Sequence, residues 1–419
     1  MLRPMKLARY ALGLIATSLG ACGDDAVSQG DTAPLEVADT QDTQEDVAPD
    51  TVVPDTATPE TDTAPDTTPD TSPDTTADTT PEVAPTCAER PVPFPMPTEP
   101  GPWNHFSSEA TTALGVDNHR GQDVIVQVGN PQVLVAKFAY AFVDKDMLCE
   151  DVDIWVQREV PCGAWQWLGE ARTSDNPDDS TDCTNYGTRY GIEDDGGRIF
   201  FEIPDNQALP VGRYPIRMVL QGDLTVASFD LVVIEPGTQA IVTDIDGTLT
   251  TGDDQLITEV ALAIFDETYT QEMYADADAM IRSWYDKGYL ILYMSGRPDM
   301  LRAMTERWVE PRFPPGPLHL TDTNAQVVPN NDGVGIYKRD YINYLKGQGV
   351  DFVAAYGNAT TDIWAYEQTA IPKDVTFIIG KHAGEENTVP LSGSYTAHLP
   401  TARAFPEATV RAPPAFGWW

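Results

Sequence analysis

Basic residues are scarce in this chain of 419 residues. It has 26 Lys and Arg against 65 Asp and Glu, a formal net charge of −39 at pH 7, and only five His and five Cys. Such an acidic body repels nucleic-acid phosphates, so we expect no nucleic-acid partner. No apolar run is long enough to cross a bilayer as a helix. The 41% of hydrophobic residues still suffices for a packed core, and the length has room for two ordinary domains plus tails.

The N-terminus has the pattern of an export signal over residues 1–21. Arg3, Lys6 and Arg9 precede a short apolar core at residues 10–19. The sequence Leu-Gly-Ala-Cys that ends at Cys22 resembles a bacterial lipobox, which implies cleavage before Cys22 and lipidation there. An ordinary secretory signal with an incidental cysteine is the alternative. We therefore expect an exported protein, anchored through Cys22 to a membrane of the bacterial cell envelope, on its periplasmic face or the cell surface.

A low-complexity segment follows over residues 22–86. Residues 23–86 carry 17 Asp and Glu and no Lys or Arg, in irregular Asp-Thr and Pro-Asp-Thr repeats. Such a composition has little apolar material to bury, so it predicts a disordered and extended linker. The remaining cysteines are Cys87, Cys149, Cys162 and Cys183. An even number in an exported chain suggests two disulfides, with three possible pairings.

Residues 100–236 alternate short apolar strands with turns, which predicts an all-β immunoglobulin-like sandwich. The expected strands are 123–128, 133–143, 152–156, 165–168, 197–203, 213–220 and 224–234. The acidic loop 170–196 suits either a Ca²⁺ site or, as we favour, a solvated loop held by a disulfide. Trp155, Trp165 and Trp167 suit either a sugar- or partner-binding face or core packing.

From 238 to 400 strands and helices alternate, which predicts a Rossmann-like parallel sheet with helices on both faces. An apolar strand at 240–242 leads into Asp244 and Asp246, and Gly247 allows a sharp turn after them. Ligands bind at the carboxyl ends of such strands. One carboxylate there can attack phosphorus, while the second handles a proton. Residues 401–419 form a C-terminal tail.

Three later segments supply further polar groups in the order that a phosphoryl-transfer site needs. A second strand at 290–294 ends in Ser295-Gly296-Arg-Pro, whose hydroxyl and backbone N–H groups suit phosphate oxygens. Lys338 offers a point positive charge. A third strand at 352–356 precedes Asn358 and Asp362, which are oxygen ligands of the kind that Mg²⁺ prefers.

These segments resemble the haloacid-dehalogenase superfamily of phosphatases, and more specifically the C-terminal catalytic domain of lipins, the Mg²⁺-dependent phosphatidate phosphatases. The resemblance covers about residues 238–400. It implies that Asp244 is the nucleophile and a metal ligand, and that Asp246 is the general acid/base and ligates the metal through its carbonyl. Lipins usually carry Ala where Gly296 stands. The spacing between motifs leaves no room for a large cap domain.

By this resemblance, the site residues divide by role. The catalytic pair is Asp244 and Asp246; the phosphate-binding set is Thr248, Ser295, Gly296 and Lys338; the Mg²⁺ ligands are Asp244, Asp246, Asn358 and Asp362. The expected function is a Mg²⁺-dependent phosphomonoester hydrolase that forms an aspartyl-phosphate and acts on phosphatidate or a related lipid phosphate. Two alternatives stay open: a lipid-binding module without catalysis, and a phosphatase for soluble phosphate esters.

Overall fold

The computed structural model describes residues 92–141, 143–159, 163–177, 183–252, 271–323 and 326–415. The chain divides into two units, residues 1–84 and 85–419, and every described residue belongs to the second. The predicted signal, Cys22, the acidic linker, Cys87 and Cys162 therefore lie outside the described residues. Within the described ranges, no helix combines the length and the apolar character needed to cross a membrane.

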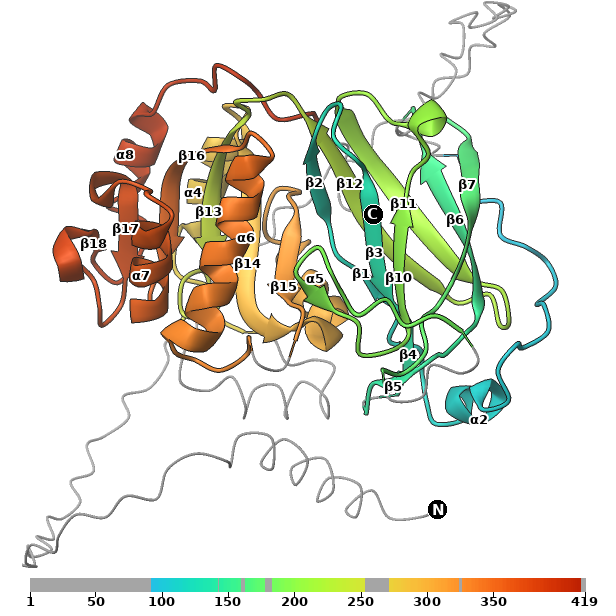
Figure 1. Ribbon diagram of the computed structural model, residues 1–419. Coiled ribbons are helices and arrows are strands. Elements are labelled where there is room, and N and C mark those ends of the chain that lie inside the picture. The colour runs from blue at the N-terminus through green and yellow to red at the C-terminus, as the bar shows by residue number, and fades with distance from the viewer. Residues whose placement is uncertain are drawn as a thin grey trace, which may run out of the picture. The chain divides into compact units, whose positions relative to one another are not determined.

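Two larger sheets and two small hairpins form the first part of the second unit (Figure 1). A three-stranded sheet has the order β1 (Arg120–Gly121), β3 (Val133–Lys137) and β10 (Arg198–Glu202). A five-stranded sheet has the order β2 (Val124–Gln127), β12 (Val226–Ile234), β11 (Gly212–Leu220), β6 (Asp151–Gln157) and β7 (Trp165–Arg172). Along β6, Val152, Ile154 and Val156 are fully buried. They alternate with the partly exposed Asp151, Asp153 and Trp155, so one face of the strand is turned to the core.

The predicted strand 133–143 is wrong in its second half. After β3 the chain forms the two-residue β4 (Ala139–Tyr140), then turns back into β5 (Lys145–Asp146). Ala141 and Asp144 both have positive φ, of 59° and 53°, which is incompatible with a continuing strand. The apolar pattern alone did not reveal this turn. Before β1 a short helix, α2 (Ser108–Thr112), was also not predicted.

The acidic loop 170–196 is closed by covalent and hydrogen bonds. Cys149 and Cys183 form a disulfide with their Cα atoms 5.6 Å apart. Buried Asp194 accepts hydrogen bonds from Ser174 Oγ at 2.6 Å and from the Tyr186 N–H at 2.7 Å. The small hairpin β8 (Thr188–Arg189) and β9 (Ile192–Glu193) completes the loop. Among the described residues, the one tight group of possible metal ligands is Asp175 with these two cysteines, whose sulfurs are already bonded to each other.

The second part contains a six-stranded parallel sheet. Its order is β15 (Leu318–Thr321), β14 (Leu290–Pro298), β13 (Gln239–Asp244), β16 (Asp351–Gly357), β17 (Thr376–Ile379) and β18 (Val389–Leu391). Each neighbouring pair runs parallel. Because all strands point the same way, their carboxyl ends meet at one edge. The chain thus combines sandwich-like β-sheets with a following α/β parallel-sheet region.

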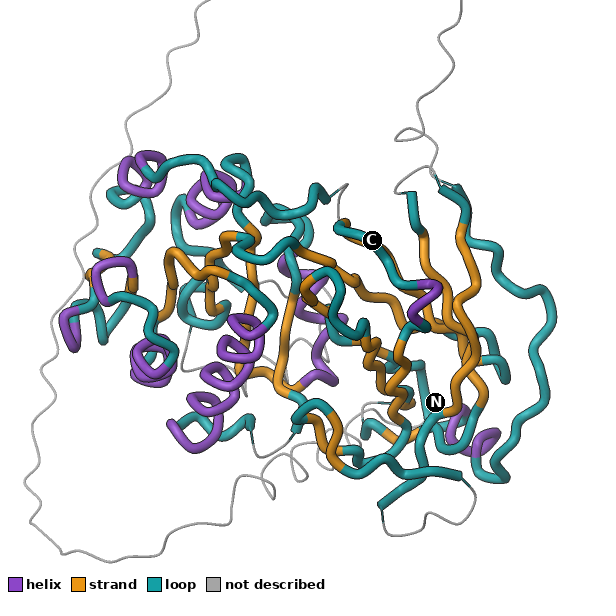
Figure 2. The backbone as a smooth tube through the Cα atoms, turned by 45° about the horizontal axis from the view of Figure 1, so that its top comes forward, coloured by secondary structure: helices purple, strands orange, loops and turns teal. Residues whose placement is uncertain are grey.

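Helices cover both faces of this sheet, while almost none accompany the sandwich strands (Figure 2). They are α4 (Ala277–Tyr285), α5 (Arg302–Val309), α6 (Ile336–Gly347), α7 (Thr360–Gln368) and α8 (Leu399–Ala404). Ile241 packs into the core beside Trp284 of α4, whereas Val242 packs into the opposite core beside Leu345 of α6. Alternate residues of one strand thus enter different cores, which explains its unbroken apolar sequence.

The sandwich and the parallel sheet share buried contacts. Ile125 and Val232 belong to the same core cluster as Val242. The buried side chain of Asp123 pairs with Arg302 of α5 at 2.9 Å and also accepts the Leu318 N–H of β15 at 2.8 Å. Because these bonds are buried and charged, they fix the sandwich against the edge of the parallel sheet.

Candidate functional site

The site begins where β13 ends. The carboxylate of Asp244 is buried at the carboxyl end of this strand. Gly247 then turns with φ of 68°, a conformation that favours glycine, and its N–H donates to Thr250 Oγ1 at 3.0 Å. This turn brings Thr248 back so that its hydroxyl lies 3.0 Å from Asp244 Oδ2. The Asp-x-Asp-Gly-Thr pattern therefore folds into a compact loop around its first carboxylate.

Lys338 joins the ends of β13 and β16. From the first turn of α6 its buried ammonium group lies 2.5 Å from Asp244 Oδ1 and 2.5 Å from Asp362 Oδ1. Asp362 in turn accepts the backbone N–H groups of Asn358 and Ala359, each at 3.0 Å, at the start of α7. One cation is thus shared between two buried carboxylates, as expected for charges that are buried only when paired.

Asp246 belongs to a second cluster, at the end of β14. Arg297 Nη2 donates to Asp246 Oδ1 at 2.6 Å, and Arg297 Nε lies 3.0 Å from Oδ2, so the guanidinium grips the carboxylate with two nitrogens. Ser295 Oγ donates to the same carboxylate at 2.8 Å. Arg297 also contacts Gln271 Oε1 at 2.7 Å and Thr305 Oγ1 at 3.2 Å. Asp246 has 14% of its side chain exposed, whereas Arg297 and Ser295 are almost fully buried.

All eight residues selected from the sequence lie at the same edge of the sheet, and the structure adds Arg297 and Tyr395. Arg297 lies in the Ser-Gly-Arg-Pro segment, but the sequence does not show whether its side chain points toward Asp246. Tyr395, whose hydroxyl donates to the Thr248 carbonyl at 2.9 Å, lies far along the chain and gave no local signal. Steric crowding also explains why glycine stands at position 296, because a Cβ there would lie 2.9 Å from Val334 Cγ2.

Burial sets the electrostatics of the site. It raises the pKa of Asp244 to about 7, an effect that Asp362 and Asp246 reinforce and Lys338 opposes. The pKa of Lys338 is raised, because its two carboxylate partners outweigh the cost of burying its charge. With all three acids ionised, the three carboxylates and the cations of Lys338 and Arg297 sum to one negative charge. The site is therefore close to electrically balanced near neutral pH.

The predicted Mg²⁺ ligands have the right chemistry but are already engaged. Asp244, Asp362 and Asn358 offer oxygen donors that suit Mg²⁺. Each carboxylate oxygen of Asp244 and Asp362, however, accepts a hydrogen bond from the protein, and Lys338 lies between the two groups. As arranged, these residues do not fit a magnesium ion, and magnesium binding stays a prediction.

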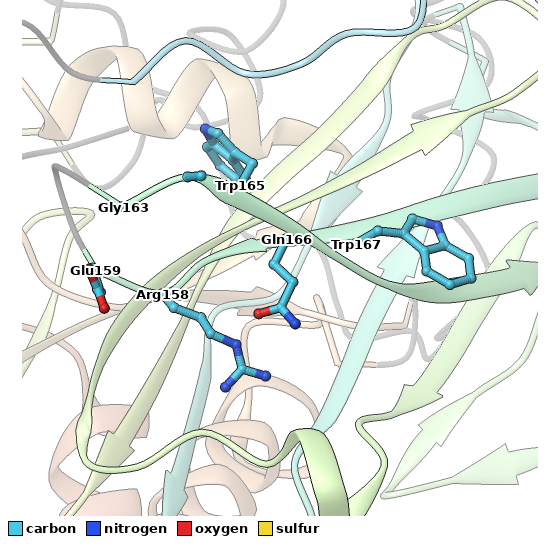
Figure 3. Close-up of a pocket in the computed structure, with 7 residues that line it drawn as sticks. Arg158, Glu159, Gly163, Trp165, Gln166 and Trp167 are labelled. Carbon is cyan, nitrogen blue, oxygen red and sulfur yellow. The ribbon is translucent and has the colours of Figure 1, made fainter.

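A separate pocket of about 540 Å³ lies on the sandwich, at β7 and the end of β6. Figure 3 shows Gln166 and Arg158 directed to one side and Trp165 to the other. Phe94 packs edge-on against Trp155 and Trp165, with ring centres 5.8 and 4.9 Å apart. Those two tryptophans therefore pack within the protein, whereas Trp167 is half exposed.

Comparison with known protein families matches both structured parts of the chain. Residues 241–380 match the model described as the PITM 1-3 LNS2 domain. Residues 117–181 and 176–233 match the model described as the PITM 1-3 beta-sandwich domain. Along this chain the β-sandwich match precedes the LNS2 match.

Individual proteins agree with these models. The chain is 33% identical to protein retinal degeneration B of Drosophila melanogaster, over 67% of this chain and 20% of that protein. It is 32% identical to membrane-associated phosphatidylinositol transfer protein 3 of Mus musculus, over 68% of this chain and 26% of that protein. It therefore spans only about a fifth to a quarter of these relatives' length. Among solved structures, the amylomaltase of Corynebacterium glutamicum aligns with a TM-score of 0.16 at 13% identity, over 42% of this chain and 20% of that chain, too low to inform fold or function.

These findings correct the predicted activity and location. The phosphatidylinositol transfer proteins are named for lipid transfer and not for hydrolysis, which contradicts the prediction of a phosphatase acting through Asp244 and Asp246. The relatives are animal proteins, and the phosphatidylinositol transfer proteins among them are named as membrane-associated, which contradicts the prediction of an exported bacterial lipoprotein anchored through Cys22. The resemblance of the motifs indicates a loop at the edge of a sheet. That local structure can serve either ligand binding or catalysis, so the resemblance did not identify the activity. Residues 117–233 of the chain are similar to the β-sandwich domain of the PITM 1-3 proteins, and residues 241–380 are similar to their LNS2 domain.

Proposed function

We propose that this protein is a lipid-binding module without catalytic activity, and that the carboxyl edge of its parallel sheet recognises the phosphate headgroup of phosphatidate or a related phospholipid. The similarity to proteins named for phosphatidylinositol transfer supports a lipid ligand. The residues at this edge also resemble those of lipins, which supports a headgroup that carries a phosphate. We also propose that the parallel sheet has the haloacid-dehalogenase arrangement and that the sandwich is immunoglobulin-like.

The pairing of Asp246 with Arg297 is the observation that carries the proposal. A general acid/base needs its carboxylate within reach of the proton that it transfers. Here both oxygens of Asp246 accept charge-assisted or hydroxyl hydrogen bonds from Arg297 and Ser295. The neighbouring oxygens of Asp244 are likewise held by Lys338 and Thr248. Both acids thus act as counter-ions that position cations.

The cations and donors in turn suit a phosphate group. A guanidinium presents paired N–H groups that match phosphate as well as carboxylate. A headgroup phosphate that reaches Arg297 and Ser295 takes the place of the Asp246 carboxylate, since both compete for the same donors. Lys338, Thr248 and the backbone N–H of Gly296 complete the proposed phosphate-binding set. Magnesium is not required for this recognition, because Arg297 and Lys338 supply the positive charge.

Vesicle sedimentation tests this function. Phosphatidylcholine vesicles with phosphatidate should retain the full chain more strongly than phosphatidylcholine alone, in magnesium or in EDTA. The variant Ser295→Ala should weaken the preference for phosphatidate. Ser283→Ala serves as the matched control, because the Ser283 hydroxyl donates only locally, to the Met280 carbonyl in α4. A colorimetric assay on phosphatidate should detect no phosphate release. Release that Asp244→Asn abolishes would contradict a purely binding role.

A further inference from the structure

Four large apolar side chains are strongly exposed at one end of the sandwich. Phe106 precedes α2, Leu114 and Val116 follow it, and Val143 lies in the turn between β4 and β5. Their exposed fractions are 89%, 56%, 79% and 64%. Single exposed apolar residues are common, but several on adjoining turns mark an interaction surface. These four residues form the apolar tip.

The turns that carry the apolar tip are held in place. The Val116 carbonyl accepts the Ala141 N–H at 2.8 Å, and a Cβ on Gly115 would lie 3.1 Å from the Ala141 Cβ, so the segment after α2 rests against the β4–β5 turn. At the other end of α2, Ser108 Oγ donates to buried Glu150 at 2.5 Å. The exposure of the tip thus belongs to an ordered surface.

A chain of ion pairs joins this surface to the candidate headgroup site. Asp144, next to Val143, pairs with Arg120 at 2.7 Å, and Arg120 also pairs with Asp299 at 2.9 Å. Asp299 directly follows β14, the strand that carries Ser295 and Arg297. Figure 1 shows α2, β4 and β5 toward the end to which the arrow of β14 points. The apolar tip and the edge of the site therefore lie on the same end of the protein.

We propose that the apolar tip inserts into the interfacial region of a lipid bilayer and so presents the edge of β14 to the headgroups. This inference rests on the proposed lipid-binding function, and it adds how the protein reaches its ligand. The free energy falls when apolar side chains leave water for the boundary of the acyl chains. A headgroup that stays in its bilayer is then within reach of a site on the same end.

The charge of the protein favours an apolar mode of docking. A net charge of −39 repels an anionic surface as a whole, so a long-range electrostatic attraction is not available. Binding that depends on basic patches weakens as salt screens it. Insertion of the apolar tip, in contrast, should persist at high salt, and screening should even reduce the repulsion.

The test compares a tip variant with a control variant in the full chain. The tip variant carries Phe106→Ser, Leu114→Ser, Val116→Ser and Val143→Ser. The control carries Trp167→Ser and Val211→Ser, which are exposed apolar residues elsewhere on the sandwich. Flotation with phosphatidylcholine vesicles containing phosphatidate, at low and high salt, measures docking. Calorimetry with monomeric dihexanoyl phosphatidate measures headgroup recognition separately.

We expect the tip variant to bind vesicles at least about tenfold more weakly, because it lacks the four apolar groups that insertion would bury in the bilayer. Its affinity for dihexanoyl phosphatidate should be unchanged. The control should match wild type in both assays. Val143→Trp should strengthen vesicle binding while its thermal unfolding temperature stays that of wild type, which separates insertion from misfolding.

Wild-type vesicle affinity in the tip variant, or no gain from Val143→Trp, would overturn the docking proposal. Failure of wild type to float with vesicles would do the same and would leave a protein partner as the occupant. If vesicles bind through the tip while dihexanoyl phosphatidate does not bind, docking stands and the proposed headgroup recognition fails.

Discussion

At the residue scale, Arg297 affects which role can be proposed for the Asp-x-Asp motif. Its guanidinium is 2% exposed and grips Asp246, the residue that the Asp-x-Asp pattern assigns to proton transfer. Removing one partner of a buried ion pair leaves the other charge uncompensated, whereas an isosteric neutral substitution keeps the shape and part of the hydrogen bonding. Asp246→Asn is therefore an informative change at this site.

We predict that Asp246→Asn strengthens binding to phosphatidate vesicles about fivefold, or roughly 1 kcal/mol, because the amide competes less well than a carboxylate for Arg297. Vesicle titration measures the change. Asp340→Asn, an exposed substitution in α6, is the matched control. Weaker binding of Asp246→Asn would show that Asp246 assists the headgroup instead of competing with it.

A second residue-scale prediction concerns Gly296. Gly296→Ala should destabilise the protein by about 1–2 kcal/mol, since its Cβ would lie 2.9 Å from Val334 Cγ2. Val334→Ala in the same chain should recover part of that loss, a coupling that thermal unfolding detects. Gly347→Ala, at a helical position with no atom within 4 Å of the new Cβ, should leave stability equal or higher. Additive effects of the two substitutions would contradict the steric explanation.

At the scale of elements, the contact between β15 and the sandwich contains an unusual acid. Asp322 directly follows β15 and accepts a hydrogen bond from Gln122 Nε2 at 2.7 Å. Burial and then the nearby charge of Asp299 raise the pKa of Asp322 from 3.8 to about 7. The folded protein therefore keeps a proton on Asp322 at pH values where the unfolded chain has lost it.

This predicts stability that falls as pH rises. Between pH 3.8 and about 7 the folded state binds more protons at Asp322 than the unfolded state, so its contribution to the free energy of unfolding declines through that window and is fully lost above it. Asp322→Asn removes this titration and keeps the acceptor for Gln122. Its Tm should thus fall less than that of wild type between pH 5 and 8, while Asp374→Asn at an exposed position should behave as wild type. Equal pH profiles for wild type and Asp322→Asn would refute this role.

Across the whole second unit, stability depends on buried ion pairs that link its two halves. Asp123 at the start of β2 accepts from the backbone N–H groups of Asp230 and Leu318, each at 2.8 Å, and pairs with Arg302. It therefore ties two strands of different sheets to one helix. Loss of Asp123 leaves the buried guanidinium of Arg302 with Glu306, at 2.6 Å, as its remaining carboxylate partner.

We predict that Asp123→Ala lowers the free energy of unfolding by about 3–5 kcal/mol and separates the unfolding of the sandwich from that of the parallel sheet. Differential scanning calorimetry should then resolve two transitions in place of one. Glu407→Ala, which breaks an exposed pair with Arg411, should change little. A single, barely shifted transition in Asp123→Ala would show that the apolar contacts suffice to couple the halves.

The sequence by itself determined the elements that local patterns encode. Val242 and its neighbours are apolar without interruption because both faces of β13 are covered, and that pattern identifies a buried parallel strand. Gly247 after the acidic pair identifies the turn, since its positive φ costs other residues more. These signals lie within a few residues of the atoms that they describe, which is why they could be interpreted without coordinates.

Only the tertiary structure decided which groups surround the acidic pair. Asp246 meets Arg297 across 51 positions of sequence, and Asp144 connects to Asp299 through Arg120, separations that no local pattern encodes. The same carboxylate serves as a proton donor or as a counter-ion according to which groups face it. Its role therefore depends on how the strands are brought together, because charges interact through space and not along the chain.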